Sequence, residues 1–368
     1  MALIEEKKAF MTGNEVVAWA AVAARADIMY GYPITPQNEI MHYWTRLAPK
    51  YEKKFMQTED ELSAGFTALG GVMAGKRAFT ATAGPGNVLM QEPIAMAEMM
   101  RIPSVMIIQQ RGGPSTATVI YAQQEVTLTT RGGNGEGMRV VYSTSTHQEL
   151  YDYTIKAFNT AWKYRFPTFV LGDGYQAKSR ETVFLYDPES RGMVMEKTVP
   201  FIGQEGEIGK DREARHYRNT FNIEEELEEV IFAHVEDYER MKPEVIEYEE
   251  QYLDTECDLL LVAHGIVARA AKSAVEALQK KGLKVGFFRP ITLRPFPVQE
   301  MYRAAMKAKK ILVAESAYGQ LALLVKEALY GLPDAPLFLE FFRPGVGITD
   351  QELIEQCEKG LRGGKNHG

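Results

Sequence analysis

Residues 59–86 read EDELSAGFTALGGVMAGKRAFTATAGPG, and this stretch decides the fold. Its first part, residues 59–74, is rich in small residues and predicts a helix. Residues 78–82 (AFTAT) then predict a strand, and residues 83–86 (AGPG) predict a tight turn into another helix. A helix, a strand and a helix in this order are typical of a parallel α/β sheet.

The same alternation extends in both directions from this stretch. Thr12 is a candidate N-cap for an alanine-rich helix over residues 14–25. Residues 104–108 (SVMII) are apolar throughout, which is typical of a fully buried strand. We therefore expect a doubly wound parallel sheet within residues 1–185. Its other expected elements are strands at 28–30, 140–143 and 168–171 and helices at 37–47 and 147–163.

A second, smaller doubly wound unit is expected in residues 251–368. Between the two units, residues 186–250 form an acidic helical linker or insertion, in which residues 187–215 are polar and irregular. Residues 223–240 predict an acidic amphipathic helix that is capped by Asn222 and stopped by Pro243. We expect its charges to form a solvated face rather than a docking surface. The second unit has expected strands at 259–263, 285–288, 311–314 and 337–341 and helices at 266–280 and 321–329.

Composition limits the classes of function. A chain of 368 residues exceeds the usual size of one hydrophobic core, so two domains are expected. The 42 Lys and Arg against 49 Asp and Glu give a net charge of −7, which argues against a nucleic-acid partner. The two cysteines, Cys257 and Cys357, are too few for an iron–sulfur cluster or a four-thiolate zinc site in this chain. No apolar run reaches the about 18 residues of a membrane span, and MALIEEKKAF is not a signal peptide pattern, so we expect a cytoplasmic protein without a membrane partner.

Two segments follow predicted strands at the edge where parallel sheets bind ligands. Gly31-Tyr32-Pro33-Ile34-Thr35-Pro36 follows the strand at 28–30, and Arg111 of the RGGPST segment follows the strand at 104–108. An arginine before two glycines can present its guanidinium group to a carboxylate or a phosphate. Taken alone, YPITP is better explained as a rigid turn, and the arginine equally well as part of a surface loop.

Other polar motifs point away from metal or hydrolase chemistry. Gly172-Asp173-Gly174 resembles the opening of a magnesium and diphosphate motif, which needs an asparagine about 25 to 30 residues later; the first one here is Asn219, so we interpret the triplet as a strand-ending turn. The scattered histidines predict no metal site, and His264 suits a structural role at a domain interface. The glycine-rich loop at 132–137 lacks a P-loop lysine and is either a flexible active-site loop or a turn. No serine lies in a nucleophile elbow.

Five motifs in one order are far more specific than any of them alone. They are TGNEVVAWAA, GYPITPQNEI, QTEDELSAGFTALGGVMAGKRAFTATAGPG, LMQE and QQRGGPST. In this combination the chain resembles the α subunit of the 2-oxoacid:ferredoxin oxidoreductases, strongly over residues 10–180 and more loosely over 256–345. The resemblance implies a thiamine-diphosphate pyrimidine-binding domain in residues 1–185 and a transketolase C-terminal-like α/β domain in residues 251–368. It does not explain residues 185–250.

The resemblance also implies a cofactor and partners. Thiamine diphosphate would be shared with a β subunit that carries the diphosphate site, its magnesium and the cysteines of [4Fe-4S] clusters. A γ subunit, a ferredoxin-like subunit and ferredoxin would be further partners, and coenzyme A the co-substrate. The reaction would be oxidative decarboxylation of a 2-oxoacid to acyl-CoA and CO2. The absence of cluster cysteines and of a complete magnesium motif in this chain fits such a division.

The resemblance also implies roles for single residues, which are identified through the motifs that contain them. Glu61 matches the cofactor-activating glutamate, whose carboxyl group works best when a desolvated pocket raises its pKa, and Glu59 is the nearby alternative. Thr35 and Arg111 match the residues that bind the 2-oxoacid, Arg111 through the carboxylate. Pro33 and Ile34 would shape the pocket beside the pyrimidine.

The sequence leaves alternatives for the substrate and for the class of protein. The apolar stretch at 117–121 (ATVIY) favours a branched-chain or aromatic 2-oxoacid over 2-oxoglutarate, although Arg131 could supply the charge that 2-oxoglutarate needs. One alternative is a subunit of another two-chain thiamine-diphosphate enzyme, a dehydrogenase or a decarboxylase. The other is a non-catalytic scaffold subunit that keeps the fold without the chemistry.

Overall fold

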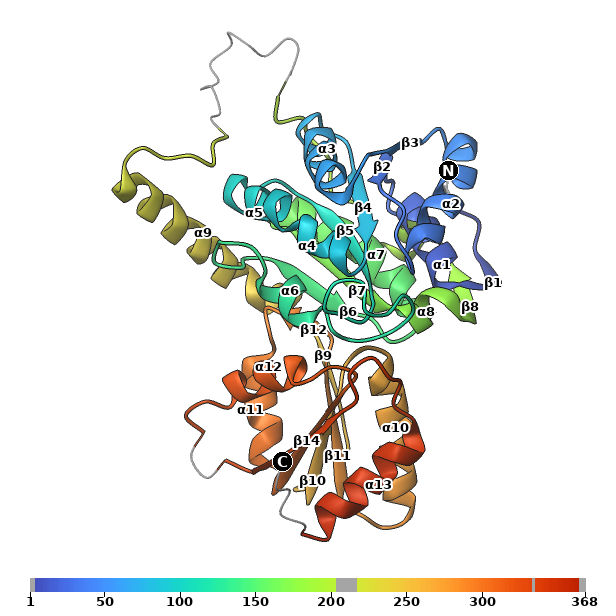
Figure 1. The fold of residues 1–368 in the computed structure, drawn as a ribbon, viewed down its shortest axis with the longest axis vertical. Coiled ribbons are helices and arrows are strands. Elements are labelled where there is room, and N and C mark those ends of the chain that lie inside the picture. The colour runs from blue at the N-terminus through green and yellow to red at the C-terminus, as the bar shows by residue number, and fades with distance from the viewer. Residues whose placement is uncertain (1–3, 203–216, 333–334, 364–368) are drawn as a thin grey trace.

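The chain folds into two α/β units (Figure 1), described here from a computed structural model for residues 4–202, 217–332 and 335–363. The N-terminal unit is built on a seven-stranded sheet, and the C-terminal unit, orange to red in Figure 1, on a five-stranded sheet. The strands β1 (Lys7–Thr12) and β8 (Arg180–Leu185) form a separate antiparallel pair. Parallel pairing dominates both large sheets, which confirms the predicted fold class.

The seven-stranded sheet is parallel except for one edge strand, which pairs antiparallel with its neighbour. Helices α1 and α7 cover one face, and α3 and α5 cover the other. In spatial order the strands are β12 (Thr292–Arg294), β6 (Val140–Ser143), β7 (Thr168–Asp173), β5 (Val105–Gln110), β4 (Ala78–Thr82), β2 (Ile28–Gly31) and β3 (Lys54–Gln57). The helices are α1 (Gly13–Ala23), α2 (Asn38–Leu47), α3 (Glu61–Met73), α4 (Pro85–Leu89), α5 (Gln91–Met100), α6 (Val126–Arg131), α7 (His147–Tyr164) and α8 (Gly174–Lys178).

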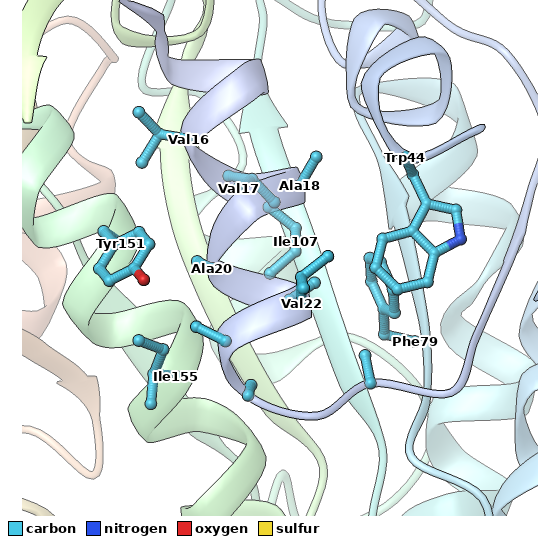
Figure 2. Close-up of a cluster of buried hydrophobic side chains, with 14 of the residues drawn as sticks. Val16, Val17, Ala18, Ala20, Val22, Trp44, Phe79, Ile107, Tyr151 and Ile155 are labelled. Carbon is cyan, nitrogen blue, oxygen red and sulfur yellow. The ribbon is translucent and has the colours of Figure 1, made fainter. Parts of the chain in front are cut away.

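Helix α1 is the centre of the largest core cluster. Thr12 caps it as predicted, because its side chain accepts a hydrogen bond from the backbone N–H of Glu15 at 3.2 Å. Alanine and valine fill seven of its eleven positions, so the helix can be buried on almost every side. Figure 2 shows it packed between Tyr151 of α7 and Trp44 of α2, above Ile107 of the sheet.

The five-stranded sheet of the C-terminal unit is parallel except for β9. Helices α10 and α13 cover one face and α11 and α12 the other. Its strands in spatial order are β14 (Leu337–Phe342), β13 (Lys310–Glu315), β10 (Leu259–Val262), β11 (Val285–Pro290) and β9 (Tyr248–Gln251). Its helices are α10 (Gly265–Lys280), α11 (Val298–Met306), α12 (Gln320–Ala328) and α13 (Asp350–Leu361).

The two units share strands and buried polar contacts. Strand β9 comes from the segment assigned to the linker, and β12 of the C-terminal unit completes the N-terminal sheet. His264 is fully buried, with its Nδ1 2.9 Å from Ser143 Oγ of the other unit. Burial, with the Arg289 charge nearby, lowers the pKa of His264 to about 3. It is therefore a neutral structural residue at the interface, as the sequence predicts.

The acidic segment forms the long helix α9 (Glu224–Val245), and two predictions about it are wrong. Ile223, not Asn222, is the N-cap residue, and within the described residues no side-chain hydrogen bond caps the helix. Pro243 lies inside the last turn instead of stopping the helix. Packing explains the difference, because Tyr238, Met241 and Val245 are buried against the N-terminal unit on both sides of the proline.

The rest of the linker is irregular. A 3-10 turn at Pro188–Arg191 lies at its start. The sequence predicts an irregular structure for residues 187–215, and of these the residues from 203 onward lie outside the described residues. Among the helices that the structure describes, none has the length and apolar character needed to cross a membrane.

Candidate functional site

Neighbouring parallel strands bring the predicted site residues to one edge of the seven-stranded sheet, where Glu61 follows the outermost strand, β3. Strands β5, β4 and β2 are adjacent and parallel, so their carboxyl ends lie side by side. The loop 32–37 follows β2, the turn 83–86 follows β4, and Arg111 follows β5 directly. This is the edge at which open α/β sheets bind ligands.

Glu61 is the first residue of α3, and its carboxyl group is buried. Asp60 caps the helix by accepting a hydrogen bond from the backbone N–H of Ser63 at 2.7 Å. The side chain of Glu61 is 4% exposed, and its Oε1 atom finds no hydrogen-bond partner among the described residues. Burial raises the pKa of Glu61 and the neighbouring Asp60 charge adds to this, whereas a hydrogen bond from its own backbone N–H and the Arg111 charge oppose it. The group is therefore biased toward the neutral acid, which can donate a hydrogen bond.

Glu59 and Asp60 precede the helix rather than lying in its first turn, which corrects the sequence prediction. The reason is the cap, because the Asp60 side chain replaces a helical hydrogen bond and fixes the start at Glu61. Glu59 is exposed and accepts a hydrogen bond from Ser63 Oγ at 2.9 Å. Burial thus separates the two glutamates and favours Glu61.

Two glycines of the AGPG turn let the site close. A Cβ atom on Gly86 would lie 2.4 Å from Glu61 Oε1 and 2.0 Å from Thr82 Oγ1. A Cβ atom on Gly84, whose φ is +52°, would lie 2.6 Å from Arg111 Nε. The turn therefore fits against both predicted site residues, and any larger residue would displace them.

Arg111 is 4% exposed, with its guanidinium group beside the loop after β2. Its Nη1 donates to the backbone carbonyl of Thr35 at 2.8 Å, while its Nε is buried without a partner in the described chain. Burial lowers the pKa of Arg111, and the charges of Glu125 and Glu61 oppose that shift. The structure thus brings Arg111 to Thr35, through the carbonyl of Thr35 rather than its hydroxyl.

The YPITP loop is held in place by two side-chain amides. Asn14 Nδ2 donates to the carbonyl of Pro36 at 2.7 Å, and Gln37 Nε2 donates to the carbonyl of Tyr32 at 2.9 Å. Within this loop Pro33 is exposed and Ile34 is half-buried. Their contact with a pyrimidine ring stays a prediction.

Sequence reasoning missed Glu125, the residue that precedes α6. Its carboxylate accepts hydrogen bonds from the backbone N–H groups of Gly84 and Arg111 and from the side-chain amide of Asn87. It therefore joins the turn after β4 to the start of the RGGPST segment. In the sequence, Glu125 is a single acidic residue next to Val126 at the start of a helix, and this pattern is too weak to identify a site.

The stretch after RGGPST is mostly on the surface. Val119 and Ile120 are 46% and 53% exposed, whereas Tyr121 is buried and stacks on Tyr175 with ring centroids 4.4 Å apart. Arg131, the candidate for the second charge that 2-oxoglutarate needs, forms an ion pair with Glu327 of α12 in the C-terminal unit. The substrate preference drawn from this stretch stays a prediction.

The GDG triplet and the loop 132–137 are each held by hydrogen bonds within the chain. Asp173 caps α8 by accepting from the backbone N–H groups of Tyr175 and Gln176, so the GDG triplet is a strand-ending turn. The loop 132–137 is held by Arg139 and Arg294 and lines a cavity of about 330 Å³ with α5 and α9. Within the residues that the structure describes, no cluster of His, Cys, Asp or Glu could hold a metal ion.

Two family models match the chain. Residues 19–250 match the pyruvate flavodoxin/ferredoxin oxidoreductase, thiamine diphosphate-binding family, and residues 257–345 match pyruvate:ferredoxin oxidoreductase core domain II. Together these matches extend over most of both α/β units and the whole of the linker at 186–250.

Individual relatives agree with these matches. The 2-oxoglutarate synthase subunit KorA of Methanocaldococcus jannaschii is 36% identical over 335 residues, 86% of this chain and 90% of the relative. The ketoisovalerate oxidoreductase subunit VorB of Methanothermobacter thermautotrophicus is 34% identical over 84% of this chain and 86% of the relative.

A solved structure shares the fold. The 2-oxoglutarate:ferredoxin oxidoreductase of Magnetococcus marinus superposes with a TM-score of 0.86 at 24% identity, over 96% of this chain and 65% of that chain. The likeness therefore extends across both units, and this chain spans about two thirds of the matched one. The motifs, the two family matches and the relatives place this chain in the pyruvate flavodoxin/ferredoxin oxidoreductase family of thiamine-diphosphate-binding proteins.

Proposed function

We propose that this chain is the α subunit of a 2-oxoacid:ferredoxin oxidoreductase. The complex would convert a 2-oxoacid and coenzyme A to acyl-CoA and CO2, and the two electrons released would reduce ferredoxin. The observation that carries this proposal is that one sheet edge holds both the buried Arg111 and the buried carboxyl of Glu61, whose Oε1 has no hydrogen-bond partner among the described residues. We also propose a cytoplasmic location, since coenzyme A and ferredoxin are intracellular cosubstrates.

Glu61 fits the ring nitrogen of an aminopyrimidine. When bound, thiamine diphosphate supplies a nucleophilic carbon that attacks the oxo group and takes up the electron pair left by CO2. Burial raises the pKa of Glu61, which favours the protonated carboxyl group that would donate a hydrogen bond to this nitrogen. Gly86 and Thr82 close the space around the carboxyl group and exclude water from it.

Arg111 fits the carboxylate that all 2-oxoacids share. Its Nη1 already bonds the Thr35 carbonyl, which fixes the guanidinium plane, and its remaining N–H groups can bind a carboxylate. A buried arginine stays protonated at neutral pH although burial lowers its pKa. The Thr35 side chain, half-buried in the same loop, would orient the oxo group.

The elements that carry the site also expose apolar side chains, which we name the α3–α4 rim. They are Met56, Leu62, Phe66, Val88 and Leu89, each between 36% and 58% exposed. A cluster of exposed apolar residues around a site marks a protein contact. We propose that the β subunit, with the diphosphate and magnesium site and the cluster cysteines, covers this rim and completes the active site.

The side chain of the substrate is either apolar, as in 2-oxoisovalerate, or carries a second carboxylate, as in 2-oxoglutarate. Relatives are named for 2-oxoglutarate and for ketoisovalerate, and the apolar stretch at 117–121 favours an apolar 2-oxoacid. Methyl viologen reduction with 2-oxoisovalerate, phenylglyoxylate and 2-oxoglutarate compares them directly. A clear preference for 2-oxoglutarate would reject the apolar choice.

Glu61→Gln in the reconstituted complex tests the function. The glutamine amide cannot exchange a proton with the ring nitrogen as a carboxyl group can, so turnover should fall by about 100-fold or more. Glu59→Gln is the matched control, because Glu59 is exposed two residues away and should leave turnover unchanged. Unchanged turnover in Glu61→Gln would support the scaffold alternative. Copurification with a chain that lacks cluster cysteines would instead support another two-chain thiamine-diphosphate enzyme.

A further inference from the structure

Glu125 is a buried carboxylate beside the proposed substrate-binding arginine. It is 4% exposed, and its Oε1 accepts from the backbone N–H groups of Gly84 at 2.8 Å and Arg111 at 3.0 Å. Its Oε2 accepts from Asn87 Nδ2 at 3.0 Å. Burial raises the pKa of Glu125, and these three hydrogen bonds and the Arg111 charge oppose that shift. Three donors directed at two oxygens suit an ionised carboxylate, which only accepts hydrogen bonds.

The charges of Glu125 and Arg111 lie on two sides of the same glycine. The N–H of Gly84 bonds the Glu125 carboxylate, while the Arg111 guanidinium crowds the position where Gly84 would carry a Cβ, with Nε 2.6 Å from it. Both side chains are buried, so solvent screens their attraction weakly. Burial lowers the pKa of Arg111, and the Glu125 charge opposes this shift more than the Glu61 charge does.

A strong grip on the substrate carboxylate would slow this reaction. Decarboxylation removes the carboxylate charge, so any attraction felt only before CO2 leaves lowers the ground state and not the transition state. A counter-charge beside Arg111 reduces that attraction. The same carboxylate also holds the Arg111 backbone to the turn that closes around Glu61.

We propose that Glu125 tunes the charge of Arg111, so that the 2-oxoacid carboxylate is held firmly enough to orient it but not so firmly that its loss is opposed. This inference rests on the proposed function. Glu125 is a positioning residue in this scheme, because it acts through Arg111 and does not touch the substrate.

Glu125→Gln in the reconstituted complex tests the proposal, because it removes the charge and keeps the shape. The KM for the 2-oxoacid should fall about five- to tenfold, and kcat should fall by a similar factor. The factor should be the same for pyruvate, 2-oxoisovalerate and 2-oxoglutarate, since they share the carboxylate that Arg111 binds.

Glu315→Gln is the matched control. Glu315 is fully buried and accepts from the backbone N–H groups of Leu321 at 2.9 Å and Ala322 at 3.0 Å. Glu315→Gln therefore removes a comparable buried carboxylate from a distant part of the chain, in the C-terminal unit. Its KM and kcat should match those of the unsubstituted complex.

A KM that rises or stays constant in Glu125→Gln would overturn the proposal and leave Glu125 with a purely structural role. Where that variant fails to assemble, Glu125→Asp keeps the charge but withdraws it by one methylene. Its KM should then fall by a smaller factor, and a KM at or above that of the unsubstituted complex would overturn the proposal equally. If the proposed function is wrong, the unsubstituted complex will turn over none of the three acids. That result would reject both the proposed function and the role of Glu125.

Discussion

Gly86 lies against the carboxyl group of Glu61, and replacing it with alanine tests whether this contact holds the group in its working position. The added Cβ would lie 2.4 Å from Glu61 Oε1, whereas ordinary contacts of a Cβ begin at 3.4 Å. The Glu61 carboxyl must therefore move by about 1 Å or α4 must tilt away. A displacement of about 1 Å in a reacting site costs about 100-fold in rate. Overpacking costs about 1–3 kcal/mol of stability.

The assay is methyl viologen reduction by the reconstituted complex, with chemical denaturation of the isolated chain beside it. Gly86→Ala should lose about 100-fold in kcat and about 1–3 kcal/mol in the free energy of unfolding. Gly70→Ala is the control for stability, since an added Cβ at this exposed position of α3 meets no atom within 4 Å in the described chain. It should gain up to about 1 kcal/mol as a helical glycine is replaced. Normal turnover in Gly86→Ala would refute the claim that the contact with Gly86 holds the Glu61 carboxyl in its working position.

Two further predictions concern substrate binding and pH. Arg111→Ala should raise the KM for the 2-oxoacid by about 10- to 100-fold by removing charge-assisted hydrogen bonds; calorimetry that shows lost thiamine diphosphate affinity at constant KM would reject this role. Burial raises the pKa of Asp173 from 3.8 to about 6, so the fold favours the neutral carboxyl. Stability should therefore fall as pH rises from about 4 to about 6, by up to about 3 kcal/mol. Asp173→Asn should remove this pH dependence in denaturation curves, and an unchanged slope would contradict it.

Local patterns predicted the elements whose signals are local. The alanine-rich helix after Thr12, the SVMII strand and the GDG turn all appear where the sequence placed them, because capping, burial and turn chemistry act within a few residues. The α9 boundaries were wrong because tertiary packing of Tyr238 and Val245 outweighs the preference of Pro243 to end a helix. Strand β12 was missed for the same kind of reason, since three residues carry no periodicity and pair with a strand 150 residues away.

The site shows the same division between local and distant contacts. Motif order pointed to Glu61, Thr35 and Arg111, and the structure gathers them at one sheet edge. Glu125 could not be found in this way, because its three hydrogen bonds come from residues 84, 87 and 111 and depend on the sheet order. A buried carboxylate is recognised by its partners, and partners distant in sequence are visible only in the fold.

The C-terminal unit supports the site through one fully buried side chain. Gln123 accepts from the backbone N–H of Ser316 at 3.0 Å and donates to the carbonyl of His264 at 2.9 Å, both in the C-terminal unit. Gln123 lies two residues before Glu125, so the segment from Arg111 to Glu125 is anchored on β5 at one end and on the second unit at the other. A shift of the C-terminal unit would thus be felt at Arg111 and Glu125. The second unit is therefore part of the support of the candidate site, although none of its residues is among those to which we assign the chemistry.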